Sequence, residues 1–152
     1  MAFPFSEENA ASRLRLRTRV AQLSDMDLAL STHYGWTVAA LFAHMAWWDQ
    51  RVLVLLQRWN EKGVDESPVD AHAVNEALRP LCHAIDPRKA IGLCLSSAEA
   101  VDAELETITS DLMKQVEANA STQFRFNRAL HRNGHLDDID ALLRTGGGAG
   151  GA

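Results

Sequence analysis

The sequence predicts an all-α protein that folds as a four-helix bundle. Four long stretches of its 152 residues repeat apolar side chains every three or four positions, which places those side chains on one face of a helix. Glycine and proline are scarce before the C-terminal tail, which argues against a turn-rich all-β fold. A chain of this length buries enough surface for one core. We therefore expect a single domain over residues 1–145 and a Gly/Ala-rich tail over residues 146–152.

The first helix is expected to run from Ser6 to about Leu23. Serine often caps a helix, and Glu7 and Glu8 would lie beside the positive end of the helix dipole. Residues 13–20 alternate arginine with apolar residues or threonine, a pattern that by itself is typical of a strand. We nevertheless expect a helix, with these arginines on solvated faces rather than at an anion site.

The second helix is expected to begin after Thr37, its N-cap, and to end at Lys62, before Gly63. The connection that follows, over residues 65–83, contains two prolines and is expected to hold a short extra helix near residues 70–78. The apolar stripe of the second helix consists of Val38, Leu41, Met45, Trp48, Val52, Leu55 and Trp59.

Two further helices complete the predicted bundle. The third should begin at Asp86 and Pro87, a favourable pair of N-cap and first helical residue, and should end near Asn119. The fourth should be capped by Ser121 or Thr122 and should continue to the tail. Its predicted inner face carries Phe124, His131, His135, Ile139 and Leu142.

Charge and composition exclude several classes of partner. The formal net charge of -5 gives no attractive field for nucleic acid or for an anionic membrane surface. No segment approaches 18 uninterrupted apolar residues, and residues 1–6 lack the features of a signal peptide, so we expect a cytoplasmic protein without a membrane span. Cys82 and Cys94 lack the spacing of a zinc site and are expected to be reduced, buried thiols.

The most informative chemical pattern is a pair of histidines, His131 and His135. A spacing of four stacks two imidazoles on one helical face, where both can bind a single ion. Six histidines in a chain of this length give about 0.2 such pairs by chance, so the spacing alone does not indicate a metal site. The position of the pair on its helix is the stronger evidence. This pair lies on a stripe that should face the core, where an imidazole without a partner costs roughly 1–3 kcal/mol.

A third histidine, His44, lies near the buried edge of the second helix, between Leu41 and Trp48. Two explanations remain at this point. Each histidine could be a core residue hydrogen-bonded to a backbone carbonyl or a carboxylate. Alternatively, three neutral imidazoles converge on one metal ion.

Two runs of residues resemble the signatures of the DinB-like family. Residues 35–48 read Gly-Trp-Thr-Val-Ala-Ala-Leu-Phe-Ala-His-Met-Ala-Trp-Trp, which is similar to the second-helix signature of that family. Residues 131–139 read His-Arg-Asn-Gly-His-Leu-Asp-Asp-Ile and are followed by Leu-Leu-Arg at 142–144, which is similar to its last-helix signature. The resemblance covers about residues 6–144.

The resemblance implies an up-down-down-up four-helix bundle that binds a divalent metal, often zinc or nickel. The metal ligands would be His44, His131 and His135. It also implies a frequent homodimer and, in some members, thiol S-transferase or isomerase activity with a low-molecular-weight thiol such as bacillithiol, mycothiol or glutathione. The maleylpyruvate isomerase branch tends to carry glutamate at the position of His131, so this chain matches that branch poorly.

Three imidazoles leave one coordination position open, as in catalytic rather than structural zinc sites. A thiol bound there would favour S-transfer to a small electrophile, and bound water would favour hydrolysis. The sequence thus leaves three hypotheses: a thiol S-transferase, a non-catalytic metal- or ligand-binding dimer, and a metal-dependent hydrolase. Trp47 is the predicted pocket residue, and no catalytic residue beyond the metal ligands is assigned.

Overall fold

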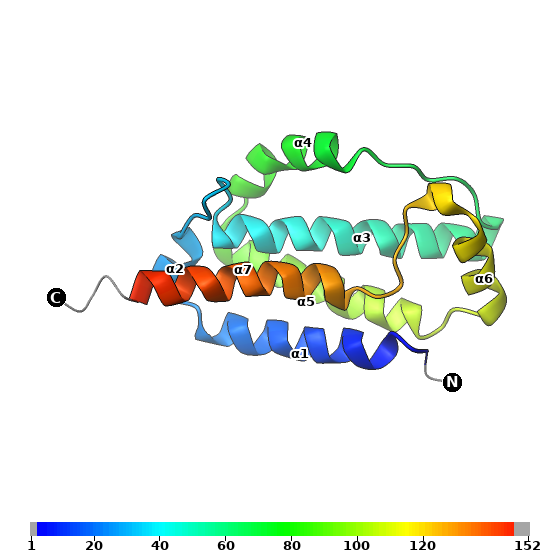
Figure 1. Cartoon of the computed structure of the whole chain (residues 1–152), viewed down its shortest axis with the longest axis horizontal. Helices are drawn as coiled ribbons and strands as arrows, with labels where there is room; N and C mark the ends of the chain where they lie inside the picture. The colour runs from blue at the N-terminus through cyan, green and yellow to red at the C-terminus, as the bar shows by residue number, and fades with distance from the viewer. Residues whose placement is uncertain (1–2, 148–152) are drawn as a thin grey trace.

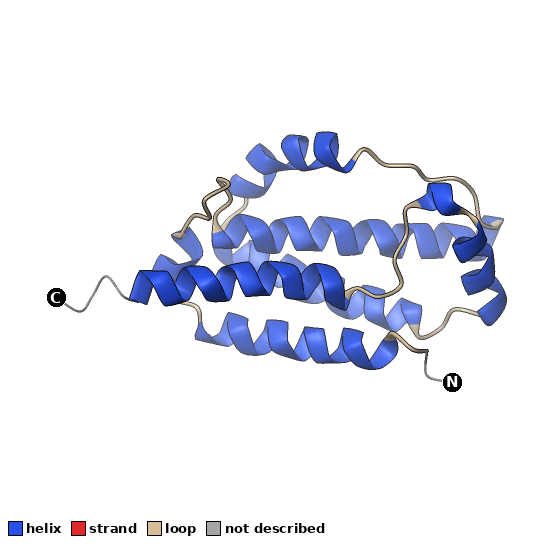
Figure 2. Ribbon diagram, in the orientation of Figure 1, coloured by secondary structure: helices blue, strands red, loops and turns tan. Residues whose placement is uncertain are grey.

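The computed structural model describes residues 3–147, and within that range it contains seven α-helices, one short 3-10 helix and no strand (Figure 2). The all-α prediction is therefore confirmed. The remainder of the expected tail, residues 148–152, lies outside the described residues. The elements are α1 (Ser6–Gln22), α2 (Asp25–Ala29), α3 (Val38–Lys62), α4 (Ala71–His83), α5 (Pro87–Leu105), α6 (Ser110–Ala118), η1 (Ala120–Thr122) and α7 (Ala129–Gly147).

The four longest helices, α1, α3, α5 and α7, lie roughly along one direction, and α4 lies beside α3 (Figure 1). The most extensive packing is between α3 and α5, while α1 packs against both α5 and α7. Buried apolar side chains form one cluster around the first half of α3 and a second cluster around its second half. No helix within residues 3–147 combines the length and the apolar character that crossing a membrane requires.

The bounds of α3 agree with the sequence prediction. The Thr37 side chain accepts a hydrogen bond from the amide of Ala40, as an N-cap does. Gly63 follows the last turn with a φ of 85°, which a residue with a side chain rarely adopts. The two ends of α3 are therefore fixed by local chemistry.

The first helix also forms where expected, although Ser6 is not its N-cap. Phe5 occupies that position, and the Ser6 hydroxyl instead accepts a hydrogen bond from the amide of Phe3. The strand-like alternation of residues 13–20 is overridden because α1 packs against α5 and α7. The arginines of this stretch form ion pairs with acidic residues of α5 and α7, so no anion site forms there.

The crossover helix is longer than predicted. α4 is capped by Asp70, as expected, but it continues through Pro80 to His83 instead of ending at Leu78. A proline inside a helix removes an amide donor and crowds the preceding turn, but the turn around Pro80 buries both Leu78 and Cys82. Burial of that apolar face holds the last turn in place.

The predicted third helix is broken into α5 and α6. Asp86 and Pro87 begin it as expected, but the helix ends at Leu105. Beyond it, the Thr107 hydroxyl donates to the backbone carbonyl of Glu104 at 2.7 Å, and the Thr109 hydroxyl caps α6. Threonine hydroxyls that bond nearby backbone groups compete with a continuous helix, which explains the break.

The last helix begins later than Ser121 or Thr122. Those residues belong to η1, and Gln123 follows with a φ of 46°. The side-chain carbonyl of Asn9 on α1 accepts from the amides of Arg128 and Ala129, and the side-chain carbonyl of Asn127 also accepts from Ala129. The start of α7 is thus capped locally by Asn127 and from another helix by Asn9, and the local sequence did not reveal the second contribution.

Candidate metal centre

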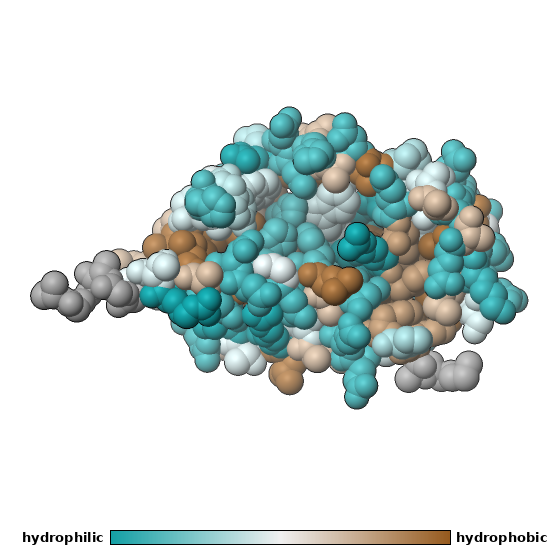
Figure 3. All heavy atoms as spheres, in the orientation of Figure 1, coloured by the Kyte–Doolittle hydropathy of each residue, from teal (hydrophilic) through white to brown (hydrophobic). Residues whose placement is uncertain are grey.

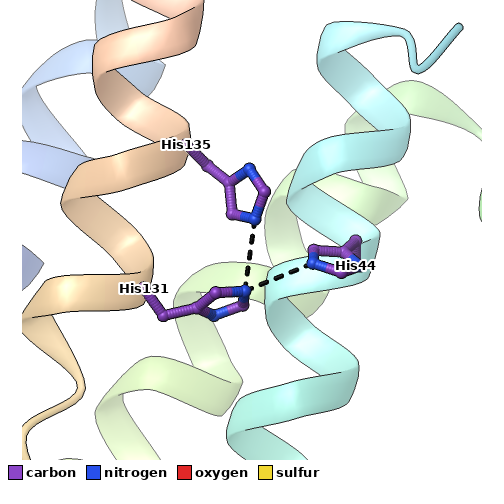
Figure 4. A group of neighbouring side chains, drawn as sticks. All are labelled: His44, His131 and His135. Carbon is purple, nitrogen blue, oxygen red and sulfur yellow. Dashed lines mark hydrogen bonds between the residues drawn. The ribbon is translucent and has the colours of Figure 1, made fainter. Parts of the chain in front are cut away.

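Three histidines from two helices point toward one another (Figure 4). His131 and His135 lie one turn apart on α7, so their rings leave the same face of that helix. His44 extends from the first half of α3, which packs against α7. The structure thus brings together the three histidines that the sequence singled out.

The rings meet through their Nε2 atoms. The Nε2 of His131 lies 3.2 Å from that of His44 and 3.2 Å from that of His135. The nitrogen atoms that the three rings offer all lie within 4.8 Å of one another. Tetrahedral bonds of 2.0–2.1 Å to a zinc ion would separate neighbouring nitrogens by about 3.3 Å. The two 3.2 Å distances around His131 therefore match those of neighbouring ligands of one ion.

Hydrogen bonding alone does not satisfy these rings. The buried Nδ1 atoms of all three histidines have no hydrogen-bond partner within the described part of the chain. A neutral imidazole has one N–H and one lone pair, so placing the proton on Nδ1 leaves the lone pairs of three Nε2 atoms facing each other. A cation at their centre would remove that repulsion, and the donor set fits zinc or nickel.

Burial keeps the three rings in the neutral form that binds metals. Desolvation and, to a smaller extent, the neighbouring His135 lower the pKa of His44 to about 3. Burial likewise lowers the pKa of His131 to about 2 and lowers the pKa of His135, although Asp138 opposes the shift of His135. The imidazoles therefore require no deprotonation at neutral pH before they bind an ion.

A cavity of about 710 Å³ opens beside the histidines. In the space-filling view the molecule is hollowed between α4 and α7, over α3, and hydrophilic side chains gather at the rim (Figure 3). Trp36 and Trp48 line the cavity, and their rings lie 5.2 and 6.4 Å from the ring of His44. The cavity is lined by Tyr34, Trp36, Leu41, His44, Trp48, Arg51, Val52, Val69, Ala71, Asn75, Gln123, Arg125, Arg128, His131 and His135.

Trp47, the predicted pocket residue, is not among these lining residues. It lies half-buried with its ring 4.9 Å from that of Trp48. At about 100° per residue, Trp48 and Arg51 lie about 40° and 20° from the direction of His44, whereas Trp47 lies about 60° from His44 and about 100° from Trp48. The cavity beside the histidines is thus lined by Trp48, the neighbour of the predicted tryptophan.

No family model, no curated protein and no solved structure matches this chain. The DinB-like resemblance therefore stays a prediction that rests on the quoted residues. What the geometry establishes is an all-α protein with a buried cluster of three histidines that can hold a metal ion.

An ionic network beside the histidines was not anticipated. Arg132, the residue after His131, has a fully buried side chain that pairs with Asp49 of α3 at 3.0 Å and with Asp102 of α5 at 2.8 Å. Arg128 pairs with the other oxygen of Asp49 at 2.9 Å. This network holds α7 against α3 and α5, and thus fixes the helix that carries two of the histidines.

One signal in the sequence could have indicated this network. Asp49 lies four positions after Met45 and three before Val52, which places a carboxylate on the apolar stripe of α3. A buried carboxylate requires a cationic partner. The partner itself could not be identified, because it lies 83 positions further along the chain.

The remaining polar candidates take no part in the histidine cluster. His83 accepts from the amide of Thr37 and bonds the carbonyl of Arg79, while the Tyr34 hydroxyl donates to Asp138 at 2.7 Å. Burial raises the pKa of both cysteine thiols, Cys82 and Cys94, so neither is activated as a nucleophile.

Proposed function

We propose that this chain is a DinB-like metalloprotein in which His44, His131 and His135 hold a divalent ion, zinc or nickel, at the wall of a substrate cavity. The observation that carries the proposal is the convergence of three buried, neutral imidazoles beside that cavity. The course of the chain supports it, because α1 and α7 run one way in Figure 1 and α3 and α5 run the other. This is the order of an up-down-down-up bundle.

The proposed activity is transfer of a low-molecular-weight thiol to a small electrophile. The metal ion would supply Lewis acidity that favours the thiolate form of a thiol. Trp36 and Trp48 offer apolar surfaces against which the electrophile can pack. In the reaction the sulfur bonds to the electrophilic carbon, the leaving group departs with the electron pair of the broken bond, and the thiol proton passes to solvent.

The residues of the cavity favour thiol transfer over hydrolysis. No aspartate or glutamate is among the lining residues within the described chain. Metal-bound water can itself ionise near neutral pH, but hydrolysis also needs a group that moves protons to the leaving group, and the three histidines would be occupied as ligands. Transfer of an ionised thiol to an electrophile whose leaving group departs as an anion needs no such carboxylate.

The test is turnover of monochlorobimane with glutathione, bacillithiol or mycothiol as the thiol donor. The zinc- or nickel-loaded protein should conjugate one of these thiols faster than the uncatalysed reaction, and chelation followed by reloading should abolish and restore the rate. His135→Ala should be inactive, whereas His72→Ala, which replaces an exposed histidine outside the cluster, should retain the rate. If the metal stabilises the fold but monochlorobimane is not conjugated with any of the three thiols, the enzyme proposal is contradicted and a binding protein is favoured.

The same resemblance leads us to propose a homodimer, which light scattering of the purified full chain would test. A mass of two chains is expected, and a mass of 16.8 kDa, that of one chain, would contradict it.

A further inference from the structure

A half-buried arginine lines the cavity on the same side of α3 as His44. Arg51 follows His44 by seven positions, which is two helical turns, so both side chains leave the same face. Arg51 and all three histidines line the cavity. A small molecule in this cavity would therefore meet the histidine cluster and a guanidinium group together.

The hydrogen-bond partners of the Arg51 guanidinium are all uncharged. Its Nη2 donates to the carbonyl of Ser67 at 2.8 Å, to the hydroxyl of Ser67 at 3.2 Å and to the carbonyl of Thr122 at 3.2 Å. Its Nη1 donates to the carbonyl of Gln123 at 3.3 Å. The Nε–H has no partner within residues 3–147. These bonds hold the group in position but leave its charge without a counter-ion.

The neighbouring arginines differ in this respect. Arg128 pairs with Asp49, and Arg58 pairs with Asp65 at 3.1 Å, whereas no carboxylate of the described residues lies within 4.0 Å of the Arg51 guanidinium. Burial lowers the pKa of Arg51, and the charges of Arg128 and Arg58 lower it further. The hydrogen bonds to Ser67, Thr122 and Gln123 account for the position of Arg51, but no neighbouring group offsets its charge, which costs stability.

The unpaired charges that line the cavity are all positive. Arg51 and Arg125 line it without an ion-pair partner among residues 3–147, and no carboxylate is among its described lining residues, although the whole chain carries a formal net charge of -5. Arg128 also lines it, but its charge is balanced by Asp49. Arg51 and Arg125 thus give the cavity a local positive charge that would attract an anion.

We infer that the cavity takes a small molecule with an oxyanion group, a carboxylate or a phosphate, which pairs with Arg51 while its apolar part lies against Trp36 and Trp48. Such a molecule would be the substrate of the proposed enzyme. Only the position of its reacting end, at the metal ion, rests on the proposed function. The anion subsite itself requires no metal.

Three probes of similar shape test the inference: phenylacetate, phenyl phosphate and the uncharged phenylacetamide. Binding to the full chain is measured by tryptophan fluorescence, since two tryptophans line the cavity. The first measurement uses protein treated with a chelator, because a carboxylate could otherwise bind the metal directly. A charge-assisted hydrogen bond should make at least one anion bind about 10- to 100-fold more tightly than the amide. The anion that binds more tightly shows whether the subsite prefers a carboxylate or a phosphate.

Arg51→Gln should abolish this preference. Arg17→Gln is the matched control, because it removes the same charge from an exposed ion pair outside the cavity, and it should keep the preference. If Arg51→Gln does not fold, Arg51→Lys replaces it as the test. Lysine retains the charge but cannot form a bidentate pair with an oxyanion, so the preference for the anion should fall by about tenfold. Equal binding of anion and amide to the native chain, or an undiminished preference in the Arg51 variants, overturns the inference.

The two proposals fail separately. Zinc uptake without any preference for anions overturns the anion subsite and leaves the metal centre standing. An Arg51-dependent preference in a chain that binds no zinc or nickel overturns the metal centre and supports the anion subsite.

Discussion

The Nε2 atoms of His131 and His44 lie 3.2 Å apart, although 87 positions separate the two residues in the chain. The Nε2 of His131 also lies 3.2 Å from that of His135, so His131 is the central member of the cluster. Loss of His131 would remove both close contacts, whereas loss of either neighbour would leave one. The packing of α3 against α7 thus creates a site that neither helix could form alone.

Stability of the metal-free protein should fall as the pH drops below about 6.5. The folded-state pKa values of His44 and His131, about 3 and about 2, lie below the unfolded value of 6.5. Between these values the unfolded chain binds more protons than the folded chain, so acid favours unfolding. The slope should reach about 1.4 kcal/mol per pH unit for each ring. Urea unfolding at pH 7, 6 and 5 measures it.

The control for this slope is His131→Leu, which removes one of the buried titrating rings. Its unfolding free energy should depend less steeply on pH than that of the native chain. Equal slopes for both proteins between pH 7 and 5 would show that the histidine cluster does not remain neutral when folded.

Removing Arg132 should destabilise the fold strongly. Arg132→Met would leave the buried carboxylates of Asp49 and Asp102 short of a partner, and such a loss costs about 3–5 kcal/mol. Arg17→Met, which removes an exposed ion pair with Glu99, should cost less than about 0.5 kcal/mol. Chemical denaturation measures both, and similar costs for the two variants would refute the role assigned to the buried network.

Nickel or copper bound at the histidines should quench tryptophan fluorescence from Trp36 and Trp48. These rings lie 5.2 and 6.4 Å from the ring of His44, and quenching by such ions acts at short range. Trp59 belongs to the other core cluster, so Trp59→Phe should keep the fractional quenching or increase it. Trp36→Phe and Trp48→Phe should each reduce it. Quenching that depends mainly on Trp59 would place the ion elsewhere.

Sequence reasoning succeeded where local chemistry decides structure. Thr37 and Gly63 fix the ends of α3, and Asp86 with Pro87 fixes the start of α5, because a cap acts on residues only a few positions away. It failed at the start of α7, which is capped both by the nearby Asn127 and by Asn9 on α1. The contribution of Asn9 could not be deduced from residues 121–128, because it comes from a distant helix.

The same distinction applies to the site. The spacing of His131 and His135 and their position on an apolar stripe indicated the pair, and His44 followed from its own stripe. The cavity-lining tryptophan and Arg51 depend on which way each side chain is turned and on what the loops at Ser67 and Thr122 supply. Those relationships arise only when the chain has folded.

The most direct test is elemental analysis of untagged protein purified without a chelator, with the native chain compared with His131→Ala, His135→Ala and His72→Ala. We expect about one zinc or nickel ion per chain in the native protein and in His72→Ala, and strongly reduced metal in the other two variants, which should remain folded. A native chain that folds, holds no metal and takes up neither ion on reloading would contradict the metal centre.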